Sequence, residues 1–123
     1  VFERKYVHAE PRPLDLDAMR RAAAQLCGRH EFSAFSTGKK TGRAATRTIE
    51  SIGIERCGEE VRRTYTGDGF LYNMVRILTG TLLEVGLGER RPDDMEAILA
   101  SHSRASAGFT APAQGLFLWD VTY

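Results

Sequence analysis

The 123-residue chain is poor in cysteine and has no long apolar run. Its two cysteines, Cys27 and Cys57, lack the spacing of a metal site, so free thiols are favoured over a disulfide. No apolar stretch reaches the ~20 residues that cross a bilayer, and we expect no signal peptide. We therefore expect a cytoplasmic protein without membrane contact. The net charge of +1 indicates no nucleic-acid partner by itself, so any such signal must be local.

The few histidines carry no recognisable chemistry either. His8, His30 and His102 lie far apart, and none has a partner at the spacing of a catalytic triad. We expect all three to be structural or solvent-facing, and we expect no metal site. The glycines of the segment 67–69 lack the third glycine and the strand context of a dinucleotide fingerprint, so a turn between a strand and a helix explains them better.

The apolar periodicity predicts, in order, a helix, a hairpin, two helices and a strand, over residues 16–26, 48–66, 70–85, 92 onward and 115–123. The last segment is apolar on both faces, which is typical of a strand buried inside a sheet. This order predicts an α+β fold in which helices pack on one face of a mostly antiparallel sheet. The chain begins at Val1 in the middle of a pattern, so we expect a piece cut from a longer protein.

Residues 36–48 contain four cations and no acidic residue, at Lys39, Lys40, Arg43 and Arg47. The glycines among them predict a mobile loop. Lysine and arginine side chains neutralise phosphates, and a flexible loop can follow a nucleic-acid backbone. A solvated surface loop explains the same composition, so both interpretations stay open.

Arg76 is placed by the helical period almost opposite the apolar stripe of the predicted helix 70–85. Composition alone favours a solvated arginine at this position. The alternative is an arginine that faces a cleft and holds a carboxylate there, because a planar guanidinium can bind a carboxylate with two hydrogen bonds.

The segments 69–76 (Gly-Phe-Leu-Tyr-Asn-Met-Val-Arg) and 80–86 (Gly-Thr-Leu-Leu-Glu-Val-Gly) closely resemble the signature helix of the tRNA pseudouridine synthase A family. Residues 107–118 resemble the closing loop and strand of that family. Weaker blocks at 30–35 and 47–49, and the helix at 13–19, agree in order. The resemblance covers essentially the whole chain and implies that residues 1–123 are the C-terminal domain of such a synthase.

The resemblance implies a pseudouridine synthase-like fold and an enzyme that isomerises uridine in the anticodon arm of tRNA without a cofactor. It implies that Arg76 forms a salt bridge to the catalytic aspartate, that Leu116 lines the base pocket, and that the basic loop contacts tRNA. The aspartate belongs to an Arg-Thr-Asp-Ala-Gly motif that this chain lacks. We therefore expect the chain to need a missing N-terminal half, to be inactive alone, and to act within a homodimer.

Two alternatives from other classes remain at this point. The chain could be a stand-alone RNA-binding module, which would not need a cleft arginine at position 76. It could also be a packing or dimerisation domain without RNA contact, and steep salt dependence of tRNA binding would argue against that class.

Overall fold

The computed structural model describes residues 2–119, and it describes side chains as far as Gly115. In chain order the helices and strands are β1 (Phe2–Ala9), α1 (Leu16–Leu26), β2 (Gly28–Glu31), β3 (Thr46–Cys57), β4 (Glu60–Gly67), α2 (Met74–Gly86), α3 (Asp94–Ser101) and β5 (Leu116–Trp119). Four short 3-10 turns lie at Ser33–Phe35, Gly42–Ala45, Arg104–Ser106 and Ala113–Gly115.

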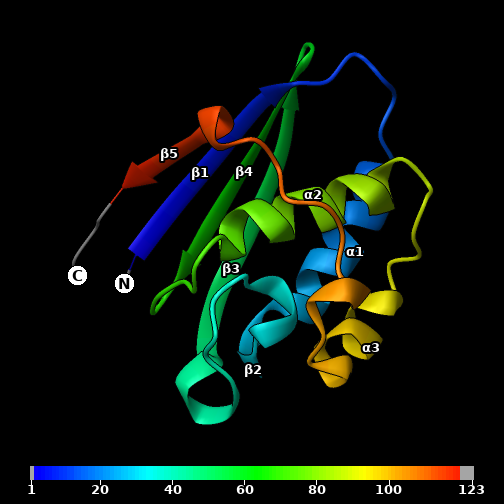
Figure 1. The fold of residues 1–123 in the computed structure, drawn as a ribbon. Coiled ribbons are helices and arrows are strands. Elements are labelled where there is room, and N and C mark those ends of the chain that lie inside the picture. Colours follow the sequence, from blue (N-terminus) through cyan, green and yellow to red (C-terminus); the bar gives the residue numbers. More distant parts are fainter. Residues whose placement is uncertain (1, 120–123) are drawn as a thin grey trace.

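The strands form a five-stranded sheet in the order β2-β3-β4-β1-β5. Every neighbouring pair is antiparallel. The three helices lie on the same side of this sheet (Figure 1). The α+β fold predicted from the sequence, with helices on one face of an antiparallel sheet, is therefore confirmed.

The hairpin of β3 and β4 has a two-residue turn, Gly58-Glu59, between the paired residues Cys57 and Glu60. Gly58 has a φ of 62°, a left-handed value that glycine adopts without steric cost. At the other end of β4, a Cβ on Gly67 would lie 2.6 Å from the carbonyl oxygen of Thr48. A glycine at this position therefore lets the two strands approach closely beside residues 36–48, which we call the basic segment.

Helices α1 and α2 pack against each other and cover the sheet. Asp15 caps α1 by accepting a hydrogen bond from the amide of Ala18. A Cβ on Gly86 would lie 2.5 Å from the sulfur of Met19, so the glycine allows this close contact. The fully buried core between helices and sheet includes Met19, Leu26, Phe32, Phe35, Ile49, Met74, Ile77, Leu78 and Leu82.

Helix α2 differs from its prediction at its N-terminal end. It begins at Met74, whereas the periodicity predicted a start at Phe70. Asn73 has a φ of 60°, which lies in the left-handed region and interrupts the helical path. The prediction of one apolar stripe was also incomplete, because almost every residue of α2 is buried.

Two strands were not predicted, and the position of a third was wrong. β1 carries charged residues on both faces, and β2 is four residues long with none of them buried, so neither strand shows apolar alternation. β5 pairs with β1 and, within residues 2–119, lies at an edge of the sheet, not inside it. An apolar run cannot tell a central strand from an edge strand. Cys27 and Cys57 are free thiols as expected, and none of the described helices is long and apolar enough to cross a membrane.

Candidate functional site

The outer face of α2 is covered by residues 107–111, which we call the closing segment. The amide of Gly108 donates to Thr81 Oγ1 at 2.9 Å, and the amide of Phe109 donates to Glu84 Oε2 at 3.1 Å. The amide of Ala111 donates to the carbonyl oxygen of Arg76 at 3.0 Å. These bonds fix the closing segment along the helix, which explains why the polar and small residues of α2 are buried.

Glycine is required where the closing segment crosses the helix. A Cβ on Gly80 would lie 1.9 Å from the carbonyl oxygen of Phe109. A Cβ on Gly108 would lie 2.8 Å from the Cα of Thr81 and 2.7 Å from a carboxylate oxygen of Glu84. The contacts with the Phe109 carbonyl oxygen and the Thr81 Cα involve backbone atoms, so rotating a side chain cannot relieve them.

Arg76 is half-buried at the junction of α2 and the closing segment. Its Nε donates to the carbonyl oxygen of Ala111 at 2.7 Å, and its Nη1 donates to Oδ1 of Asn73 at 3.0 Å. Burial raises the pKa of Tyr6, and the charges of Arg63 and Arg76 partly oppose this shift. The arginine is therefore held in a fixed position, and it is not the freely solvated residue that composition alone favoured.

Asn73 connects Arg76 to the basic segment. Its amide nitrogen donates to Thr37 Oγ1 at 3.0 Å, while its carbonyl oxygen accepts from Arg76. The backbone carbonyl of Tyr72 accepts from Ser36 Oγ at 3.1 Å. The start of the basic segment is thus tied to the turn that precedes α2.

The basic segment is more regular than a loop. Lys39, Lys40 and Arg43 are exposed, whereas Arg47 lies half-buried within β3. The prediction of a loop reaching residue 48 was therefore wrong at its end, because β3 begins at Thr46. Arg47 Nη1 donates to the carbonyl oxygens of Ala44 and Thr46, at 3.0 and 2.8 Å. The structure thus gives three solvent-facing cations and one anchored cation beside the turn that leads into α2.

A cavity of about 400 Å³ lies between β1, α2 and the segment that follows the closing segment. Tyr6 lines it and donates from its hydroxyl to the carbonyl oxygen of Pro112 at 2.6 Å. Thr79 lines the opposite wall, and its hydroxyl bonds to that of Tyr65 at 2.8 Å. Burial raises the pKa of Tyr65 to about 12, so its hydroxyl stays protonated at neutral pH. The side chain of Leu116, predicted to line a base pocket, lies outside the described residues.

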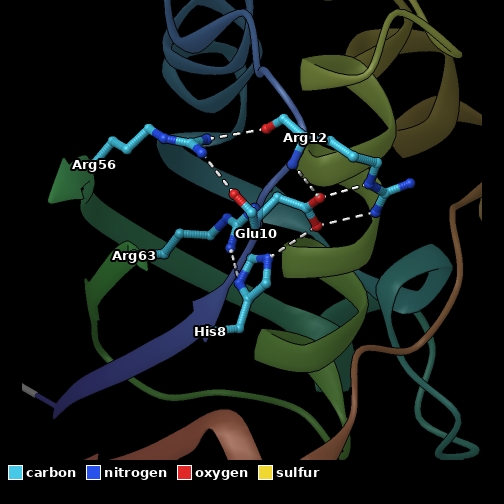
Figure 2. A network of polar contacts seen from close by, with 5 residues as sticks. All are labelled: His8, Glu10, Arg12, Arg56 and Arg63. Atoms are coloured by element: carbon cyan, nitrogen blue, oxygen red, sulfur yellow. Dashed lines mark hydrogen bonds and ion pairs between the residues drawn. The ribbon is translucent and has the colours of Figure 1, made fainter. Parts of the chain in front are cut away.

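A second polar cluster, shown in Figure 2, was not found from the sequence. Arg63 on β4 is fully buried, and its Nη1 lies 3.2 Å from Nδ1 of His8 on β1. His8 Nε2 lies 3.6 Å from Glu10 Oε2, and the Glu10 carboxylate accepts two hydrogen bonds from the Arg12 side chain. The hydrogen bonds from Arg12 lower the pKa of Glu10 to about 2. Arg56 donates to the carbonyl oxygens of Glu10 and Arg12.

Protons and charges in this cluster follow from the geometry. Arginine can only donate, so Nδ1 of His8 must be unprotonated, and the neutral ring then carries its hydrogen on Nε2, toward Glu10. Burial first, and the charge of Arg63 second, lower the pKa of His8. Burial also lowers the pKa of Arg63, whose Nε and Nη2 have no hydrogen-bond partner among the described residues.

Each of the other two histidines makes a polar contact with one neighbouring group. His30 Nε2 lies 2.9 Å from the carbonyl oxygen of Cys27, and His102 Nδ1 lies 3.0 Å from the Glu31 carboxylate. Within the described residues, no cluster of histidine, cysteine and carboxylate side chains could hold a metal ion.

These observations define an α+β domain in which one arginine and a cationic segment meet at the start of a buried helix. A sequence model of the family described as tRNA pseudouridine synthase matches residues 22–123 of the chain. The chain therefore belongs to the tRNA pseudouridine synthase family.

The relatives extend beyond this chain. The chain is 47% identical to tRNA pseudouridine synthase A of Brevibacillus brevis over 123 residues. The matched residues are 100% of this chain and 50% of the relative. The chain is 49% identical over 116 residues to tRNA pseudouridine synthase A of Halalkalibacterium halodurans, covering 94% of this chain and 44% of the relative. The same-named protein of Acetivibrio thermocellus is 47% identical over 110 residues, 89% of this chain and 45% of the relative. The chain thus spans about half the length of the curated relatives it matches.

Proposed function

We propose that this chain is the C-terminal half of a cytoplasmic enzyme that isomerises uridine to pseudouridine in the anticodon stem-loop of tRNA. The observation that carries the proposal is the similarity along the entire chain to synthases of twice its length. In this reaction the bond from C1′ to N1 breaks, a bond from C1′ to C5 forms, the proton on C5 leaves, and N1 gains a proton. No electron is gained or lost, so the reaction needs no redox cofactor.

Arg76 is proposed to hold the catalytic aspartate of the N-terminal half ionised and oriented. Its Nε and Nη1 are used by Ala111 and Asn73, and its Nη2 makes no hydrogen bond within residues 2–119. A guanidinium fixed on two sides presents its remaining N–H groups in one direction, which suits a carboxylate. Because the helix and the closing segment both hold it, little ordering is needed when the aspartate arrives.

The flipped uridine would enter a cleft between the two halves, since a base must leave its stack before chemistry can occur on it. Leu116 is proposed to line this base pocket. Lys39, Lys40, Arg43 and Arg47 are proposed to contact tRNA phosphates, and the lysines and Arg43 are exposed as this requires. The complete enzyme is proposed to act as a homodimer.

Reconstitution tests the proposal. The chain is expected to release no tritium from tRNA labelled at C5 of uridine, because it lacks the aspartate motif. The same chain mixed with a separately expressed N-terminal half of a relative, or joined to it in one protein, is expected to release tritium. Turnover by the chain alone would contradict the proposal that the catalytic aspartate lies in the N-terminal half. A folded, joined protein that binds tRNA without releasing tritium would instead favour an RNA-binding module.

A further inference from the structure

Two pockets adjoin each other beside the turn that precedes α2. The smaller has a volume of about 180 Å³ and is lined by Ser36, Gly38, Lys39, Lys40, Arg47, Phe70, Leu71 and Tyr72. The larger has a volume of about 500 Å³ and is lined by Phe2, Arg4, Thr46, Arg47, Asp68, Gly69 and Phe70. Because they share Arg47 and Phe70, the two pockets form one continuous surface, which we call the basic groove.

Positive charge dominates the basic groove. Lys39, Lys40 and Arg47 line the smaller pocket, and no carboxylate occurs among the described residues that line it. Asp68 lines the larger pocket, but its Oδ1 already accepts a hydrogen bond from the amide of Thr48 at 2.9 Å. The groove therefore suits a ligand that carries several negative charges.

Aromatic rings are interleaved with these cations. Tyr72 is 71% exposed, more than Phe2 and Phe109, the other exposed large apolar side chains among the described residues. Its backbone is held in place, because its carbonyl oxygen accepts from Ser36 Oγ. Phe70 lies between the two pockets, with the Arg4 guanidinium 5.6 Å from its ring centroid. The aromatic ring of Tyr72 is therefore not packed in the core, although its backbone is held in place.

Cations along a groove together with an exposed ring are the two features that bind unpaired nucleic acid. The cations neutralise the backbone, and each unpaired base can stack on an aromatic face. A duplex keeps its base faces stacked inside, so it could contact the lysines but could not stack a base on the Tyr72 ring.

We propose that the basic groove binds single-stranded RNA, with one unpaired base stacked on Tyr72 and the flanking phosphates on Lys39, Lys40 and Arg47. This inference rests on the proposed function and deepens it. It assigns an unpaired part of the RNA substrate, not its helical stem, to this surface. It also gives Tyr72 a positioning role that phosphate contact alone does not require.

Binding of two RNA probes to the 123-residue chain tests the proposal. The probes are a labelled oligouridylate of about 12 nucleotides, within the site size of known single-strand binders, and an RNA duplex of the same length. Fluorescence anisotropy is measured at several salt concentrations for the wild type, Tyr72→Ala, Tyr72→Phe and the double variant Lys39→Ala/Lys40→Ala. Circular dichroism checks that each variant keeps the wild-type fold.

Tyr72→Ala is expected to weaken binding of the single strand about tenfold, in the range of one lost stacking contact. It should leave duplex binding and the salt slope unchanged, and Tyr72→Phe should bind like the wild type. The double lysine variant should weaken both probes and reduce the slope for the single strand by roughly 1 to 1.5. Equal loss in both tyrosine variants, or tighter binding of the duplex than of the single strand, would overturn the proposal.

The RNA-binding experiment and the reconstitution experiment test the two proposals independently. If the reconstituted enzyme modifies tRNA while Tyr72→Ala binds the single strand normally, the groove assignment is wrong and the enzyme assignment stands. If reconstitution gives no turnover while the stacking effect is present, the groove assignment stands and the enzymatic one is wrong.

Discussion

Asn73 and Arg76 form a 3.0 Å hydrogen bond across the start of α2, between the amide oxygen of the asparagine and Nη1 of the arginine. Asn73 can reach Arg76 because its φ of 60° turns the chain just before the helix begins. The same side chain donates to Thr37 at the start of the basic segment. The proposed catalytic arginine and the proposed RNA-binding segment are therefore joined through one residue.

Replacing Arg76 tests its assigned role most directly. In the complete enzyme, Arg76→Ala is expected to abolish turnover with little loss of tRNA affinity, because an arginine that orients a catalytic carboxylate contributes to the reaction more than to binding. Single-turnover tritium release and a separate tRNA binding assay measure the two effects. Arg76→Lys keeps the charge but not the planar fork, and we expect it to recover only a small part of the rate. Wild-type turnover in Arg76→Ala would contradict the role.

Asn73 allows its backbone and side-chain roles to be separated. Asn73→Gly keeps the left-handed conformation and removes the bond to Arg76, whereas Asn73→Ala also strains the backbone. We expect both variants to lower turnover of the complete enzyme by tenfold or more, because a hydrogen bond to a charged group contributes about 1.5–3 kcal/mol. Urea unfolding should find Asn73→Ala less stable than Asn73→Gly by about 1 kcal/mol. Equal stability of the two variants would show that the turn does not constrain this residue.

Gly80→Ala probes the contact between α2 and the closing segment. The new methyl group would lie 1.9 Å from the carbonyl oxygen of Phe109, so the segment must move. We expect a loss of about 2 kcal/mol in the free energy of unfolding, since overpacking outweighs the better helix propensity of alanine. Gly53→Ala is the matched control, because its methyl group would meet only Thr64 Cβ, at 3.9 Å. Its effect should stay within about 0.5 kcal/mol, and a similar loss in both variants would contradict the steric explanation.

The helical and hairpin parts of the fold could be predicted because their signals are local. Helix α1 and the β3–β4 hairpin follow from periodicity and from turn glycines. The full burial of α2 could not be predicted, because it depends on a segment that lies about thirty residues later in the chain. Gly80 and Thr81 are small or polar, and that segment contacts both of them.

The hypothesis for the candidate site came from family resemblance more than from its residues alone. Composition favoured a solvated Arg76, and the bonds that hold it come from Asn73 and Ala111, whose positions depend on the folded structure. Arg63 alternates along β4 with Val61 and Tyr65, and this period was the sequence signal that placed it on the buried face. Its residue type indicated the opposite, because arginine is almost never fully buried without a partner.

Arg63 is expected to destabilise the fold. Its Nε and Nη2 have no partner within the described residues, and an unpaired buried charge costs more than an apolar side chain of similar length. Arg63→Met should therefore raise the free energy of unfolding by about 1 kcal/mol or more in urea titrations at neutral pH. Arg63→Ala is the contrasting variant, because it removes the charge but leaves a cavity. If Arg63→Met were less stable than the wild type, the Arg63 guanidinium would have to be stabilised by more than its hydrogen bond to His8.

The pH dependence of stability should depend on His8. Burial and the charge of Arg63 lower the pKa of His8 in the folded protein below its usual 6.5. As the pH falls below about 6.5, the unfolded chain takes up a proton at this residue and the folded protein does not. The free energy of unfolding should therefore fall with decreasing pH from that point, until the pH passes the lower pKa of the folded state. Above pH 6.5 the contribution of His8 is fully present.

Two variants isolate this effect because they change the pKa of His8 in opposite directions. Arg63→Met removes a charge that lowers this pKa, so stability should depend less on pH between about 6.5 and 5. Glu10→Gln removes a charge that raises it, so stability should depend more on pH in the same interval. Glu10 itself has a pKa of about 2 in the folded protein and titrates below this window, from its usual 4.5 downward. Urea unfolding at closely spaced pH values measures the slopes, and identical slopes in the two variants would exclude His8 as their source.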